Sequence, residues 1–73
     1  MKVRTNMALL IKNRGSSLRK LNDATGINIS RLSYMQRGAA LPTDKELEAI
    51  CLALQVTADM IYPDEELRKV LAE

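Results

Sequence analysis

The sequence has 73 residues, a formal net charge of +2, no histidine and one cysteine. This length suits one domain over residues 1–73, and the counts exclude both an internal disulfide and a Cys/His metal cluster. Without histidine, the chain also lacks the usual general base and the usual partner of a nucleophilic serine or cysteine. We therefore expect a protein that is not an enzyme and that uses no cofactor and no metal.

The apolar residues favour helices over strands. They make up 47% of the chain and are mainly Leu, Ile, Ala and Met, with no Phe or Trp and only two Tyr. No run of about 18 apolar residues is present to span a membrane, and the apolar part of the N-terminal stretch is too short for a signal peptide. These features predict an all-α, cytoplasmic protein without a membrane partner.

The net charge hides a strong division along the chain. Residues 1–40 hold eight basic residues and one acidic residue, whereas residues 41–73 hold three basic and eight acidic residues. Such asymmetry favours an interpretation in which the first half binds a polyanion. The second half would then serve packing or bind a partner. The alternative is an ordinary solvated basic surface.

Capping and glycine signals divide the first half into three short helices. Apolar residues at i, i+3 and i+4 predict a helix over residues 5–13. Ser17 is a favourable N-cap for a second helix, and Gly26 suits the left-handed residue that ends it. Asn28 then caps a third helix. A helix, a tight glycine turn and a second helix are therefore predicted over residues 17–37.

The second half predicts one longer helix followed by shorter ones. Thr43 and Glu46 have the spacing of a capping box at the start of a fourth helix, whose apolar face continues to Leu54. Thr57 is expected to cap a short fifth helix. Residues 64–73 begin with an acidic cluster that suits a helix N-terminus, so we expect a final short helix or tail there.

Residues 15–38, GSSLRKLNDATGINISRLSYMQRG, resemble the helix-turn-helix of the Cro and phage-repressor (XRE-like) DNA-binding family. The resemblance extends over roughly residues 5–62. It implies an all-α, five-helix, lambda-repressor-like domain with a short C-terminal helix, in which the third helix enters the DNA major groove. The matching motif positions are Leu21, Gly26, Ile27, Ser30, Leu32, Ser33, Arg37 and Gly38.

The sequence departs from the family pattern at several positions. Leu18 stands where the family commonly has a glutamine that contacts DNA, so we do not expect that contact here. Asn22 replaces a small residue. Gln36 and Ile11 stand where the family often has a glutamate paired with an arginine. Because both members are changed together, no buried charge is left without its partner.

The resemblance assigns DNA contacts to the residues around the third helix. Base contacts are expected from Ile29, Ser30 and Tyr34, with a thymine methyl as the partner that suits Ile29. Two alternatives remain open: Ile29 packs under the second helix, or Tyr34 covers the loop after the third helix. The residues expected to contact phosphate are Ser17, Arg19, Asn28, Arg31, Ser33 and Arg37.

These assignments imply a small transcriptional regulator, with repression as its expected mode, that binds double-stranded DNA at a palindromic operator. We expect a homodimer, because one recognition helix reads few base pairs. Its interface is expected at Met60, Ile61, Leu67, Val70 and Leu71. In the alternative, Leu67 and Leu71 fold back on the first helix. A different functional class is an antitoxin or adaptor whose C-terminal half binds a protein partner.

Overall fold

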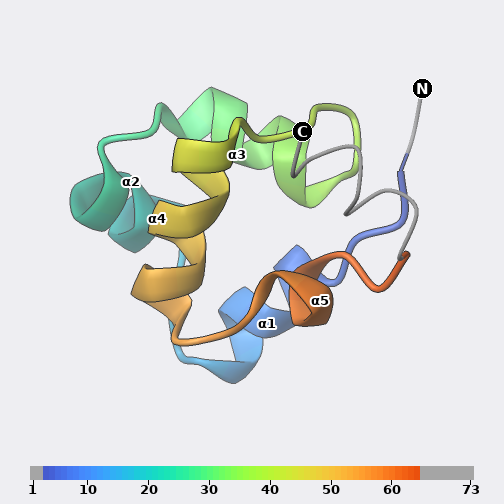
Figure 1. Cartoon of the computed structure of the whole chain (residues 1–73). Helices are drawn as coiled ribbons and strands as arrows, with labels where there is room; N and C mark the ends of the chain where they lie inside the picture. Colours follow the sequence, from blue (N-terminus) through green and yellow to red (C-terminus); the bar gives the residue numbers. More distant parts are fainter. Residues whose placement is uncertain (1–2, 65–73) are drawn as a thin grey trace.

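The computed structural model describes residues 3–64 and arranges them as five α-helices with no strand (Figure 1). This confirms the expected all-α, five-helix architecture of a helix-turn-helix domain. The short C-terminal helix expected at residues 64–73 lies outside the described residues except for its first position. The helices are α1 (Met7–Asn13), α2 (Leu18–Thr25), α3 (Ile29–Gln36), α4 (Asp44–Leu54) and α5 (Ala58–Ile61).

Capping signals set both ends of α2 and the start of α4. Ser17 precedes α2 and its Oγ accepts a hydrogen bond from the Lys20 N–H. Gly26 ends α2 with φ at +76°, a left-handed conformation that glycine adopts without a Cβ penalty. At the start of α4, Thr43 and Glu46 bind each other's backbone N–H groups and form the capping box.

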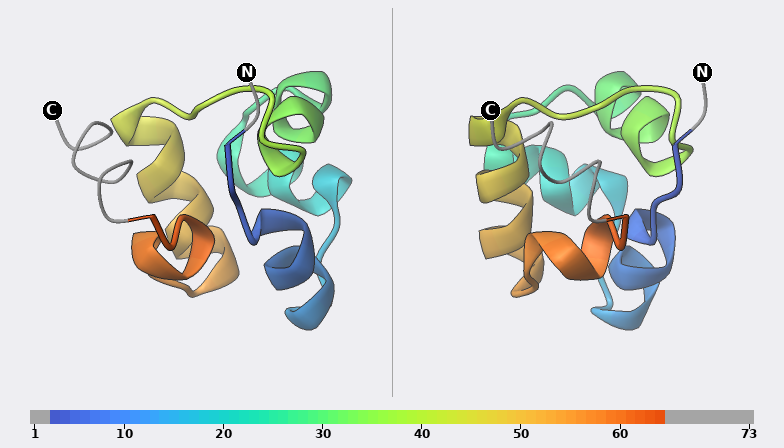
Figure 2. Two further views of the ribbon diagram at one scale, coloured as in Figure 1. Left: turned by 90° about the vertical axis from the view of Figure 1, so that its right-hand side faces the viewer. Right: turned by 45° about the vertical axis from the view of Figure 1, so that its right-hand side comes forward.

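The core lies where α2 and α3 pack together and α4 closes over α2. In Figures 1 and 2, α3 lies at one end of the molecule, while α1 and α5 lie at the other. Between them the core collects apolar side chains from every helix and from two of the connections. Its buried members are Met7, Leu10, Ile11, Leu21, Ile27, Leu32, Met35, Ile50, Leu54, Val56, Ile61 and Tyr62.

The N-terminal segment, residues 3–6, joins both ends of the molecule (Figure 2). The Val3 N–H donates to the Gly38 carbonyl at 2.8 Å, just beyond α3, and the Asn6 N–H donates to the Ile61 carbonyl at 2.8 Å. The Asn6 side chain also donates to the Met60 carbonyl. α1 starts at Met7, two residues later than the apolar spacing predicted.

Ile61, which was expected in a dimer interface, is buried within the chain. The Ile61 side chain is 1% exposed and belongs to the core. The reason is that α5 turns back over α1 and α4, which directs Ile61 inward and leaves Met60 exposed. Thr57 precedes α5 as expected, yet its hydroxyl bonds to the Asp59 carboxylate and makes no capping hydrogen bond.

Candidate nucleic-acid interface

The outer face of α3 carries the three residues expected to contact bases. Ile29 is 44% exposed and Tyr34 is 52% exposed, and Ser30 between them is also exposed. The opposite face of the same helix is closed, because Leu32 and Met35 are fully buried. The exposure of Ile29 does not fit the alternative in which it packs under α2.

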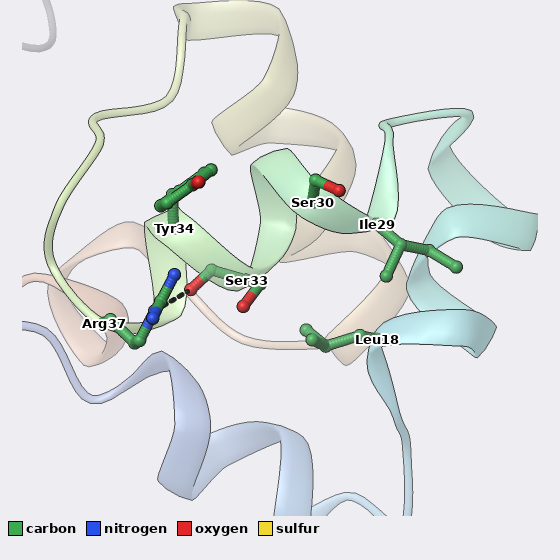
Figure 3. Close-up of a pocket in the computed structure, with 6 residues that line it drawn as sticks. All are labelled: Leu18, Ile29, Ser30, Ser33, Tyr34 and Arg37. Atoms are coloured by element: carbon green, nitrogen blue, oxygen red, sulfur yellow. Dashed lines mark hydrogen bonds between the residues drawn. The ribbon is translucent and has the colours of Figure 1, made fainter.

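These residues line a shallow hollow between the start of α2 and the outer face of α3, which we call the α2–α3 hollow (Figure 3). Its walls combine two aliphatic side chains, two hydroxyl groups, a phenol ring and a guanidinium. The lining residues are Leu18, Ile29, Ser30, Ser33, Tyr34 and Arg37. The surface therefore offers apolar contact, hydrogen bonding and positive charge within two turns of one helix.

Leu18 is the member of this hollow that the sequence analysis did not assign to the site. The structure leaves it half-buried, in contact with the core and with the hollow at once. The signal that could have found it is its position in the motif, where the family commonly has a glutamine that contacts DNA.

Arg37 is held at the C-terminal end of the hollow. Its Nε donates to the Ser33 carbonyl at 3.3 Å, and its guanidinium carbon lies 5.0 Å from the centre of the Tyr34 ring. This separation suits a cation–π contact. The side chain of Arg37 remains exposed, so the positive charge lies beside the phenol and faces solvent.

The helix N-termini on this side of the molecule are capped by residues expected to contact phosphate. Ser17 caps α2, and the Asn28 Oδ1 accepts from the Ser30 N–H at 2.8 Å at the start of α3. Arg19 is exposed on the first turn of α2, and the Lys20 ammonium donates to the Gly15 carbonyl at 3.1 Å. Basic groups and helix N-termini thus occur together, an arrangement that suits anions.

Arg31 differs from the other residues in the expected phosphate set, because its guanidinium is paired with a carboxylate of the same chain. Its Nε and Nη2 pair with the Glu46 carboxylate at 2.6 and 2.7 Å. The Arg31 hydrogen bond holds the pKa of the Glu46 carboxyl down at about 2, against a usual value of 4.5. The sequence analysis used Glu46 only for its capping box and did not find this ion pair.

The expected dimer residues divide between core and surface. Met60 is exposed, Ile61 is in the core, and Leu67, Val70 and Leu71 lie outside the described residues.

No helix within residues 3–64 is long and apolar enough to cross a bilayer.

The comparisons with known proteins find similarity to a transcriptional regulator. Over 51 residues the chain is 33% identical to the transcriptional regulator ClgR from two strains of Mycobacterium tuberculosis. The alignment covers 70% of this chain and 46% of ClgR, so the chain spans about half the length of the curated relatives it matches. No protein-family model and no solved structure matches the chain.

Proposed function

We propose that the protein is a sequence-specific, double-stranded-DNA-binding transcriptional regulator of the Cro and phage-repressor (XRE-like) type, acting as a repressor. The observation that carries this proposal is the two-sided character of α3. Leu32 and Met35 fix its inner face in the core, while Ile29, Ser30 and Tyr34 form a continuous exposed face. A helix presented in this way has the dimensions that the major groove admits.

The α2–α3 hollow offers chemistry that suits base edges. Ile29 provides an apolar surface for a thymine methyl, and the hydroxyls of Ser30 and Tyr34 can donate to or accept from bases. We assign these three residues to sequence readout. Leu18, at the rim of the hollow, adds apolar surface where the family commonly has a glutamine.

Phosphate contacts are assigned to the groups around this face. They are the exposed Arg19 and Arg37, the capped N-termini at Ser17 and Asn28, and the hydroxyl of Ser33. Residues 1–40, with eight basic residues against one acidic residue, supply the positive field that attracts a polyanion. Arg31 is left out of this set because its guanidinium already binds Glu46.

We further propose that two copies bind a palindromic operator. One α3 helix of eight residues contacts only a few base pairs, so a two-fold dimer is needed to select a site. Two recognition helices would then lie about 34 to 36 Å apart, one turn of DNA. Exposed Met60 is the described residue available to such an interface, and buried Ile61 is withdrawn from it.

A second candidate function is the protein-binding module, antitoxin or adaptor. It is favoured by the acidic second half of the chain and by Leu52, which is 73% exposed on α4. A large apolar side chain on an acidic surface suits a partner with a basic, apolar surface. Co-purification of such a protein together with the absence of duplex binding would favour this candidate over the regulator.

The test is selection of duplexes from a random pool, followed by fluorescence anisotropy on the selected duplex over a salt series. If about four to six phosphates are neutralised, log K falls against log salt with a slope near −4 to −5. Arg37→Ala reduces the magnitude of the slope by about 0.9. Lys45→Ala, at an exposed position of α4, leaves the slope unchanged.

Sequence preference is tested by repeating the selection with Tyr34→Ala and Ser30→Ala. Each substitution should change the selected sequence, because base contacts specify whereas phosphate contacts position. The number of protomers that bind a half-site, compared with the number that bind a full palindrome, reports the stoichiometry. No binding at low salt refutes the regulator, and unchanged preference in both variants refutes the assignment of the base-reading face.

A further inference from the structure

We infer that Arg31 and Glu46 form a positioning pair that sets the orientation of α3 for DNA readout, and that Arg31 is not itself a phosphate ligand. The inference rests on the proposed function. Its basis is the set of hydrogen bonds around the pair, which connects α3, the loop after it and the start of α4. None of the DNA contacts assigned above includes Glu46.

The pair is a two-point contact between a flat guanidinium and a carboxylate. Arg31 Nε lies 2.6 Å from Glu46 Oε2, and Arg31 Nη2 lies 2.7 Å from Glu46 Oε1. Two parallel hydrogen bonds fix the angle between the groups as well as their distance. The same Nη2 donates to the Leu41 carbonyl at 3.1 Å, so the loop between α3 and α4 is held as well.

Glu46 is also held by Thr43. Its Oε1 accepts from the Thr43 N–H at 2.8 Å, and its own N–H donates to Thr43 Oγ at 3.2 Å. The capping box therefore limits the rotamers of Glu46, and Arg31 meets a carboxylate that is already in place. Through it, α3 is connected to the first turn of α4.

The place of Arg31 around α3 shows what this connection controls. With 3.6 residues in each turn, Arg31 falls on the flank of the helix, between the face that carries Ser30 and Tyr34 and the face that carries Leu32 and Met35. The buried face rests on the core, and the Arg31–Glu46 contact adds a directional restraint on the flank of the helix. Rolling α3 would turn Ser30 and Tyr34 away from a base edge.

The charge of the pair argues against a direct phosphate contact. At neutral pH the Glu46 carboxylate is ionised, because its pKa lies near 2. Arg31 and Glu46 together carry no net charge, and a phosphate brought to Arg31 would also approach the carboxylate. Arg19 and Arg37 have no carboxylate among their hydrogen-bond partners in the described part of the chain.

The experiment compares Arg31→Gln, Glu46→Gln and the double variant on the selected duplex by anisotropy over a salt series. Glutamine is accepted at the third position of a capping box, so Glu46→Gln removes the ion pair and keeps the cap. Lys45→Gln and Glu48→Gln are matched controls, since each removes one exposed charge from the same helix.

We expect each single variant to bind about fivefold or more weakly, equivalent to the loss of one good base contact. The salt slope should stay that of the wild type, and the double variant should bind no more weakly than the weaker single variant. The controls should bind as the wild type does. Arg31→Lys, which keeps the charge and loses the fork, should be as weak as Arg31→Gln and serves where Arg31→Gln does not fold.

The opposite pattern would overturn the inference. If Arg31 binds phosphate, Arg31→Gln lowers the magnitude of the salt slope by about 0.9, Arg31→Lys retains binding, and Glu46→Gln binds as tightly as the wild type or more tightly. A wild-type protein that binds no duplex instead refutes the proposed function, so the two failures are distinguishable.

Discussion

Gly38, two residues after the end of α3, is the glycine whose replacement should cost the fold most. Its φ is +78°, and a Cβ built on it would lie 2.2 Å from the Val3 carbonyl oxygen. Real atoms do not approach so closely, so Gly38→Ala must displace the N-terminal segment. Gly26 provides the control, because its φ is +76° and a Cβ there meets nothing within 4 Å.

The two substitutions share one cost and differ in another. A non-glycine residue in the left-handed region costs about 1 to 2 kcal/mol, and this applies equally to Gly26→Ala and Gly38→Ala. Displacing the N-terminal segment also breaks the hydrogen bond from the Val3 N–H to the Gly38 carbonyl, worth about 0.5 to 1.5 kcal/mol, and exposes part of the Val3 side chain. We expect Gly38→Ala to be about 1 to 2 kcal/mol more destabilising than Gly26→Ala.

Urea denaturation followed by far-ultraviolet circular dichroism measures this difference. Thermal unfolding should show it too, because about 1 kcal/mol corresponds to roughly 4 to 8 °C in a domain of this size. Equal losses of unfolding free energy in Gly26→Ala and Gly38→Ala would refute the reasoning. Such a result would mean that the contact between Val3 and Gly38 contributes nothing to the stability of the fold.

Two further predictions concern the core and the ion pair. Leu32→Ala should lower the free energy of unfolding, measured by urea denaturation, by about 2 to 5 kcal/mol because Leu32 is 0% exposed. Leu52→Ala on the surface should change it by less than about 0.5 kcal/mol. Similar losses in the two variants would contradict the core assignment. The pKa of Glu46 in the folded state is about 2, below its usual value of 4.5. The ion pair therefore stabilises the fold fully above about pH 4.5, and this contribution disappears as the pH falls toward 2. The free energy of unfolding of the wild type should therefore exceed that of Glu46→Gln by less and less as the pH falls through that range. Glu48→Gln is the control. A difference that stays constant with pH would contradict the ion-pair account.

The local elements follow from the sequence because their causes act within one helical turn. Ser17 and Asn28 accept from N–H groups two or three residues ahead, and the two members of the capping box, Thr43 and Glu46, are three positions apart. Gly26 adopts the left-handed conformation that only its own residue type makes easy. Signals of this range can be read without knowing the fold.

The exposed face of α3 was also within reach of the sequence. Leu32 and Met35 are apolar and three positions apart, so helical periodicity puts them on one face. The exposure of Ile29, Ser30 and Tyr34 follows from the same rotation along the helix. Their contacts with DNA stay a prediction.

Only the tertiary structure decided the contacts between distant residues. The Arg31–Glu46 pair joins residues 15 positions apart, and Asn6 binds Met60 across 54 positions. Whether such groups meet depends on how α4 and α5 return over the core, and no local pattern records that path. The burial of Ile61 has the same cause. Met60 and Ile61 are adjacent and both apolar, so their residue types do not say which one is buried. The direction of α5 turns Ile61 inward and Met60 to solvent.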